Sequence, residues 1–250
     1  MTTLSVRDIA ERRLGVSGDL SMDTDVYGYI YRDDDGSLFG TLGPLDVLPG
    51  TGGPTTRSLK RHLEMLDAVC IDVVLFKVAH EADFTGVFTR DDVTKAQYAV
   101  QVARDLYATV NLGIRSVIWR GIGNADGLQF INIENDGDVR KLARSYSGPP
   151  GSVDVFLVQT IDGFSGLSPT NGPCNKDTDF ETTGCAVALD GDRFWTGRTL
   201  AHEIGHYLGL DHEDPGSNLM AKPSNYGSVV ITSSQATTMK DHCMAQPAAG

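Results

Sequence analysis

The stretch Thr199–Met220, TLAHEIGHYLGLDHEDPGSNLM, holds three of the six histidines in the chain. Within it His202, Glu203 and His206 form an H-E-x-x-H pattern. Residues four apart lie on one face of a helix, so both imidazoles can reach a single metal ion. The pattern therefore predicts a helix that carries two metal ligands and a carboxylate beside the first of them.

The residues that follow extend the pattern to a third ligand. Gly209 can adopt a positive φ and end the helix sharply, which lets His212 turn back towards the other two histidines. Three neutral imidazoles leave one coordination position of zinc open to water, and such an open site is typical of catalysis. Zinc lowers the pKa of that water, and Glu203 is the candidate general base. The reaction implied is hydrolysis of a peptide bond.

The extended pattern resembles that of the metzincin zinc endopeptidases. The resemblance implies a Met-turn, which places a methionine beneath the metal, and Met220 stands eight residues after His212, as in matrixins. Matrixins carry Ser after the third histidine, whereas this chain has Glu213, as astacins do. Astacins carry a tyrosine two residues past the methionine, which stabilises the transition state, and this chain has Lys222 at that position. Tyr226 lies a little further on, and it either takes over this role or is an ordinary structural tyrosine. We therefore expect a divergent metzincin.

The region before the motif alternates segments of strand and helix character, which predicts an α/β (α+β) fold with helices packed on a mixed sheet. The resemblance implies a zincin-like fold, with a mostly parallel sheet, an active-site helix and a C-terminal helix. The predicted strands are Ile71–Ala79, Arg115–Ile122, Val153–Ile161 and Cys185–Leu189, and the predicted helices outside the motif are Thr56–Ala68, Thr89–Val110 and Ile231–Cys243.

The N-terminal region reads differently from the rest of the chain. Asp25–Tyr31 and Leu38–Val47 are predicted strands on either side of an Asp-Gly turn. Pro49–Pro54 (PGTGGP) breaks secondary structure and marks a candidate boundary. We therefore expect an N-terminal extension or prosegment over residues 1–65 and a zincin-like catalytic domain over residues 66–250.

Four cysteines permit two disulfides in three pairings. Cys174 and Cys185 bracket a short polar loop that a disulfide closes easily, so we expect this bridge, which leaves Cys70 with Cys243 by elimination. The alternative is four buried free thiols. A disulfide would agree with a secreted protein, although the N-terminus lacks the apolar segment of a secretory signal.

Composition limits the partners. The net charge is −12 and Lys and Arg form no run, which argues against nucleic acid or an anionic membrane as partner. No apolar stretch reaches the roughly 18 residues of a membrane span. We expect a monomer that acts on a protein or peptide. Besides zinc, calcium is a candidate cation at the acid-rich turns Asp33–Asp35, Glu134–Asp138 and Asp190–Asp192, where the alternative is solvated carboxylates.

One alternative of a different class stays open. A noncatalytic zinc-binding module, or an effector or toxin that keeps the metal site, would contain the same three histidines. A purely structural site needs neither the open coordination position nor Glu203, and this favours the enzyme.

Overall fold

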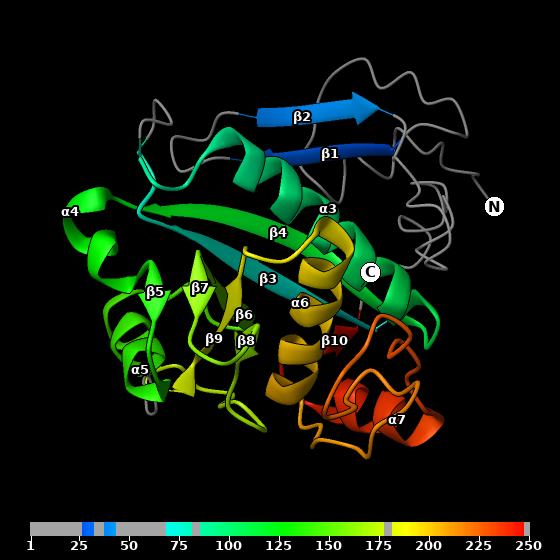
Figure 1. The fold of residues 1–250 in the computed structure, drawn as a ribbon. Coiled ribbons are helices and arrows are strands. Elements are labelled where there is room, and N and C mark those ends of the chain that lie inside the picture. The colour runs from blue at the N-terminus through cyan, green and yellow to red at the C-terminus, as the bar shows by residue number, and fades with distance from the viewer. Residues whose placement is uncertain (1–26, 33–37, 44–68, 82–85, 178–181, 248–250) are drawn as a thin grey trace.

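The computed structural model describes residues 27–32, 38–43, 69–81, 86–177 and 182–247, with side chains from residue 69 onward (Figure 1). The predicted breaker at 49–54 and the predicted helix at 56–68 lie outside these residues. The division into an extension over 1–65 and a domain over 66–250 therefore stays a prediction.

The described strands form a mixed, mostly parallel sheet in the order β2-β1-β4-β3-β6-β9-β8 (Figure 1). Neighbours from β1 to β9 in this order run parallel, and the pairs β1–β2 and β8–β9 are antiparallel. The predicted fold class is confirmed. The bounds are β1 Tyr27–Arg32, β2 Leu38–Gly43, β3 Val69–Val78, β4 Leu112–Ile122, β6 Ser152–Val158, β8 Gly166–Leu167 and β9 Gly184–Ala188.

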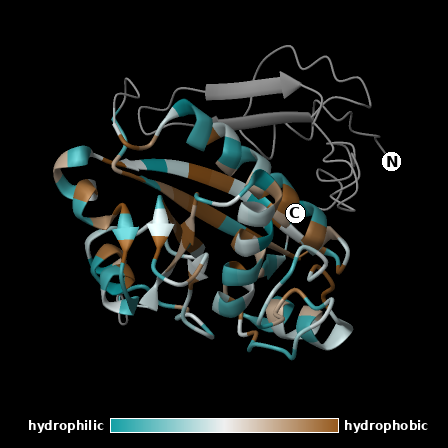
Figure 2. Cartoon of the chain, viewed as in Figure 1, coloured by the Kyte–Doolittle hydropathy of each residue, from teal (hydrophilic) through white to brown (hydrophobic). Residues whose placement is uncertain are grey.

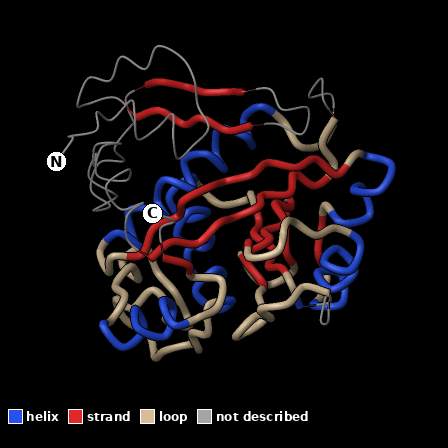
Figure 3. Tube along the Cα trace, turned by 180° about the vertical axis from the view of Figure 1, so that it is seen from behind, coloured by secondary structure: helices blue, strands red, loops and turns tan. Residues whose placement is uncertain are grey.

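Short strands complete the arrangement. β10 (Gln246–Pro247) pairs antiparallel with the start of β3, so the C-terminal end returns to the centre of the sheet. β5 (Asn132–Ile133) and β7 (Thr160–Ile161) form a separate parallel pair. The view from behind shows the strands of the main sheet following one another with a continuous twist (Figure 3).

The described helices lie on both faces of the sheet. α3 and α6 pack against each other on one face, and α5 packs on the other. None of the described helices is long and apolar enough to cross a bilayer. The bounds are α3 Arg90–Ala108, α4 Asn124–Gly127, the 3-10 helix η1 Leu128–Phe130, α5 Asp136–Ser145, α6 Arg193–Tyr207 and α7 Ser233–Asp241.

The central strand β3 shows why helices cover both faces. Its side chains alternate, so that Ile71, Val73 and Leu75 belong to the core beneath α3 and α6. Val74 and Phe76 belong to the second core, beneath α5. Brown, hydrophobic segments run along β3 and β4 (Figure 2). A parallel strand that is apolar on both sides must be covered on both faces, because leaving either side in water would forfeit the free energy of burial.

Two of the predicted helices, α3 and α7, begin with a threonine N-cap. Thr89 caps α3, and its hydroxyl accepts a hydrogen bond from the Asp92 backbone N–H at 3.3 Å while the Asp92 carboxylate accepts from the Thr89 N–H at 2.8 Å. Thr232 and Gln235 form the same reciprocal box at the start of α7. These capping boxes satisfy backbone donors that the first turn of a helix leaves unpaired.

The predicted strand Val153–Ile161 and the acid-rich turn Glu134–Asp138 both differ from the structure. The predicted strand Val153–Ile161 ends as β6 at Val158, because the Gln159 N–H donates to the Ile131 carbonyl at 2.8 Å and the chain moves to β7 in the second sheet. The acid-rich turn Glu134–Asp138 begins α5, which the sequence analysis missed. The N-cap of α5 is Asn135, whose side chain accepts from the Gly137 N–H at 2.8 Å, and the Asp138 carboxylate in the first turn accepts from the Glu134 N–H at 3.2 Å.

Candidate metal centre

The motif helix α6 ends as the glycine predicts. Gly209 has a φ of +95°, so the predicted positive φ is confirmed. The Leu210 N–H donates to the Gly205 carbonyl at 3.0 Å, and the Gly209 N–H donates to the His206 carbonyl at 2.9 Å. These two bonds define a Schellman motif, which satisfies the last carbonyls of the helix and reverses the chain. The reversal brings His212 back towards α6.

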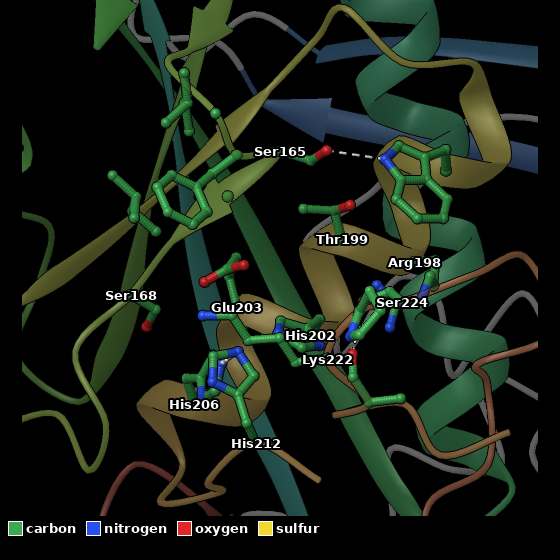
Figure 4. Close-up of a pocket in the computed structure, with 18 of the residues that line it drawn as sticks. Ser165, Ser168, Arg198, Thr199, His202, Glu203, His206, His212, Lys222 and Ser224 are labelled. Atoms are coloured by element: carbon green, nitrogen blue, oxygen red, sulfur yellow. Dashed lines mark hydrogen bonds between the residues drawn. The ribbon is translucent and has the colours of Figure 1, made fainter. Parts of the chain in front are cut away.

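The structure brings together the three histidines of the sequence motif. The ligand nitrogens of His202, His206 and His212 all lie within 4.8 Å of one another, and the three rings converge in Figure 4. The Nε2 atoms of His206 and His212 are 3.2 Å apart. Two nitrogens bound to tetrahedral zinc at its usual bond length are separated by about 3.3 Å. The cluster therefore fits a zinc ion.

The two helical histidines are oriented by backbone carbonyls. The Nδ1 atom of His202 is 2.8 Å from the Leu219 carbonyl oxygen, and Nδ1 of His206 is 2.6 Å from the Leu210 carbonyl oxygen. A carbonyl oxygen only accepts, so each Nδ1 carries the proton and each Nε2 keeps a free lone pair. This is the second-sphere arrangement by which proteins orient metal-binding histidines.

Burial keeps all three imidazoles neutral. It lowers the pKa of His202 to about 3. The hydrogen bond to Leu219 opposes this shift to a smaller extent, and neighbouring positive charges reinforce it. It also lowers the pKa of His206 and of His212 below their usual range. Only the neutral imidazole binds a metal, because protonation occupies the lone pair. The cluster is therefore ready to bind an ion at neutral pH.

Arg198 is a positioning residue that the sequence analysis missed. The residue is 2% exposed, and its guanidinium donates to the Leu219 carbonyl at 2.6 Å and to the Ser228 carbonyl at 2.9 Å. It thereby holds the same carbonyl that orients His202. Arg198 stands four residues before His202, on the same helix face, and that spacing is the signal that could have identified it. Burial lowers its pKa only to about 10, so it remains charged at neutral pH.

Met220 packs against the motif helix α6. Its side chain is fully buried, and its Sδ would lie 3.0 Å from a Cβ added at Gly205. Its backbone N–H donates to the Asn218 side chain at 2.8 Å, which holds the turn. The glycine thus leaves room for the sulfur between the turns that carry His202 and His206.

Glu213 does not face the metal cluster. Its backbone pairs with the segment after Met220, donating to the Met220 carbonyl at 2.9 Å and accepting from the Lys222 N–H at 3.0 Å. Its carboxylate accepts from the Gln235 side chain at 3.4 Å. Gln235 also exchanges hydrogen bonds with Asn218 at 2.9 and 3.1 Å. The acid after His212 therefore connects the third-ligand segment to the start of α7.

Glu203 projects from α6 towards the edge strand β8. It is 5% exposed, and a Cβ added at Gly166 would lie 2.5 Å from its Cγ and 2.6 Å from its Cδ. Burial raises the pKa of its carboxyl to about 8, although the charges of Arg198 and Lys222 oppose this shift. A carboxyl group whose pKa lies near the working pH can both accept a proton and release it again, which suits general acid–base catalysis.

The cluster opens into a cleft with a volume of about 630 Å³. α6 forms its floor, the β7–β8 segment forms one wall, and the segment after Met220 forms the other. Figure 4 shows Ser165 and Ser168 on one side of the histidines and Lys222 and Ser224 on the other. The lining is Ile161, residues 163–168, Asp190, Trp195, Arg198, Thr199, His202, Glu203, His206, His212 and residues 221–224.

Tyr226 is not among the described residues that line the cleft. Its ring stacks on Phe194 with a centroid distance of 6.2 Å, and it also contacts Trp195. Its hydroxyl donates to the carboxylate of Asp192, the N-cap of α6. The hydroxyl of Tyr226 is therefore held at the start of α6, and its role as a transition-state stabiliser stays a prediction. Asp192 itself caps a helix, which accounts for this acid without calcium.

The predicted disulfides are wrong in their pairing. Cys174 is bonded to Cys243, with the two Cα atoms 5.7 Å apart, while Cys70 and Cys185 are buried free thiols. Cys185 lies inside β9 and is fully enclosed by the core, while its expected partner Cys174 is bonded to Cys243. Cys243 follows α7 and reaches Cys174 from a sequence separation of 69.

The disulfide supports the end of the motif helix. The Asn171 and Gly172 N–H groups donate to the His206 and Tyr207 carbonyls at 2.9 and 2.8 Å. The bonded Cys174 therefore anchors a segment that caps the turn carrying His206. By loop-closure entropy, a bridge of this separation contributes about 4 kcal/mol to stability.

Comparison with known proteins supplies one similarity in sequence. No known family profile matches the chain. Over 88 residues it is 34% identical to human "A disintegrin and metalloproteinase with thrombospondin motifs 14". The matched segment covers 35% of this chain and 7% of that protein. The crystal structure of metalloproteinase-II from Bacteroides fragilis aligns with a TM-score of 0.47 and 16% identity, over 70% of this chain and 53% of that one.

Proposed function

We propose that the protein is a zinc-dependent endopeptidase. The observation that carries the proposal is the convergence of three neutral histidines and one buried glutamate at the floor of an open cleft. His202, His206 and His212 would hold the ion. The partial sequence similarity to a protein named as a metalloproteinase supports the same chemistry.

Each residue has a distinct task in the proposed reaction. Bound zinc supplies Lewis-acid chemistry and a water of lowered pKa. Glu203 takes the proton of the attacking water on its carboxylate and passes it to the leaving amine. Arg198 and the Leu219 carbonyl keep His202 in its orientation. The buried floor limits the access of bulk water to the Glu203 carboxylate.

The edge strand β8 explains how a peptide would be oriented. β8 pairs with β9 on one side only in the described sheet, and its residues Gly166 and Leu167 line the cleft. An extended peptide can add to such an edge through backbone hydrogen bonds. A substrate held in this way would lie beside Glu203 and would be recognised mainly through its backbone rather than through one particular side chain. Recognition of an extended backbone favours an endopeptidase, which cuts inside a chain.

Two finer points belong to the proposal. The position of Met220 beneath α6 supports a metzincin-type centre, and the departures at Glu213 and Lys222 support a divergent one. The Cys174–Cys243 disulfide supports residence in an oxidising, extracellular environment. The alternative of a noncatalytic zinc-binding module does not account for the open cleft beside Glu203.

The proposal is tested by digestion of a proteome-derived peptide library. The protein, loaded with one equivalent of zinc, is expected to cut internal peptide bonds and to stop when a chelator removes the ion. Adding zinc back is expected to restore cleavage at the same positions. Metal content is measured in each sample. A zinc-loaded protein that cuts nothing, or that cuts equally well after the metal is removed, contradicts the proposal.

Gly166→Ala is expected to lower kcat/KM by about 100-fold, the usual cost of displacing a reacting group by roughly 1 Å. The added Cβ would overlap the Glu203 side chain, 2.6 Å from its Cδ, and push the carboxylate out of place. Zinc content is expected to stay at one equivalent, since no histidine is touched. Gly216→Ala is the matched control, because a Cβ there meets nothing closer than 4.0 Å. Wild-type activity in Gly166→Ala would mean that Glu203 needs no fixed position.

A further inference from the structure

Lys222 places a positive charge in the cleft. It is an exposed residue in the wall that follows Met220, and its Nζ lies 5.8 Å from the centre of the Phe164 ring. Phe164 belongs to the opposite wall and is 54% exposed. The lysine and the ring therefore approach each other across the cleft. Both residues line the cleft in which a substrate would bind.

The charge of Lys222 reaches the metal centre. It lowers the pKa of Glu203, of His206 and of His212, although it is not the largest influence on any of them. Figure 4 shows the lysine beside these residues. In the part of the chain that the structure describes, its ammonium makes no ion pair, and its contact is the ring of Phe164.

The other charges of the cleft leave Lys222 available to a ligand. Arg198 is buried, and its Nε and Nη2 atoms donate to the carbonyls of Ser228 and Leu219. The carboxylates of the lining are Asp190 and the buried Glu203. With a divalent ion bound, the lining becomes positive, although the whole chain carries a net charge of −12. A positive cleft in an acidic protein attracts anionic groups that the remaining surface repels.

We propose that Lys222 is a specificity-determining residue that selects substrates with a carboxylate close to the bond that is cut. This inference rests on the proposed peptidase function and names its substrate class. The ammonium is a hydrated point charge on a flexible stem, so it can follow a carboxylate over a few ångströms. The partner is the side chain of Glu or Asp, or the free C-terminal carboxylate of a short peptide.

The experiment uses matched fluorogenic peptides built on a sequence that the zinc-loaded protein cuts. In one series Glu replaces Gln at each position in turn around the cleavage site. In another, a short peptide ends in a free carboxylate or in an amide. The wild type is expected to prefer Glu to Gln at one position by roughly 5- to 10-fold in kcat/KM, the effect of one charged contact in a partly exposed site. A preference for the free carboxylate over the amide instead identifies the terminus as the ligand.

Charge variants assign the preference to the lysine. Lys222→Met is expected to bring the Glu-to-Gln ratio of kcat/KM close to one, and Lys222→Glu is expected to reverse the preference in favour of the Gln peptide. Lys141→Met is the control, because it removes the same charge from α5, where Lys141 pairs with Asp138 outside the cleft. It should keep the wild-type ratio. Raising the salt to 0.5 M should reduce the wild-type preference, since salt screens exposed charges.

A binding measurement separates recognition from chemistry. Zinc-loaded Glu203→Gln protein is titrated with labelled Glu and Gln peptides, and the affinity ratio is expected to depend on Lys222 in the same way. If the wild type cuts all peptides of both series equally, or if Lys222→Met slows all of them by one factor, the specificity proposal is wrong while the peptidase proposal stands. If no peptide is cut and none binds, both proposals are wrong.

Discussion

Glu203→Gln is expected to lower kcat by about 10³-fold, within the range that a general base contributes. Glutamine has the shape of glutamate, so it should keep the close packing against Gly166 and the fold of α6. It cannot accept the proton of the attacking water. The effect should therefore fall on kcat, with KM and zinc content close to the wild type.

The measurement is steady-state cleavage of a peptide from the library, together with zinc content and thermal unfolding. Glu134→Gln is the matched control, since Glu134 is an exposed glutamate outside the cleft and should keep full activity. A Glu203→Gln protein with one equivalent of zinc and wild-type kcat would sink the proposed mechanism. A protein that has lost its zinc as well would show that the carboxylate helps to hold the ion.

His206→Ala is expected to abolish both stoichiometric zinc binding and activity. His206 is the middle ligand, its Nε2 lies 3.2 Å from that of His212, and its Nδ1–H is held by the Leu210 carbonyl. Two remaining imidazoles cannot enclose the ion as three do. In the wild type, zinc at 100 times its dissociation constant should stabilise the fold by about 2.7 kcal/mol, because it binds only the folded state.

Thermal unfolding with and without zinc measures this increment directly. The wild type should melt at a higher temperature with zinc, and His206→Ala should melt at the same temperature in both samples. His242→Gln is the control, because His242 is a buried histidine that also bonds a carbonyl, that of Gly172 at 3.0 Å, but lies outside the metal cluster. It should keep the zinc-dependent shift. An unchanged shift in His206→Ala would remove this histidine from the proposed ligands.

Much of the centre could be predicted because it lies in one short segment. The spacing of His202 and His206, the turn at Gly209 and the return of His212 depend on helix geometry and on the freedom of glycine, which are local properties. The strands and capped helices followed in the same way from alternation and from capping residues. The extent of β6 did not, because the point where a strand leaves its sheet depends on the partner at Ile131.

The contacts around the centre could not be predicted. Cys174 pairs with Cys243 because α7 returns the chain to the end of α6, and Cys185, closer in sequence, is enclosed in β9. The Glu203 carboxylate faces Gly166 because β8 is the edge strand of the sheet, and Glu213 bonds Gln235 because α7 begins beside the third-ligand segment. Each of these three contacts depends on how segments that are distant in the sequence pack together.

The side chains that can hold a metal follow from the amino-acid order alone, because a helical repeat and a glycine turn fix the relative directions of residues only a few positions apart. Their surroundings come from the packing of distant segments: the carbonyl of Leu219 and the guanidinium of Arg198 behind His202, and the Lys222 ammonium across from Phe164. The difference lies in the range over which each effect acts. Backbone geometry acts over a few residues, whereas the burial, the charge and the walls of a cleft come from segments that meet only when the sheet and its helices pack.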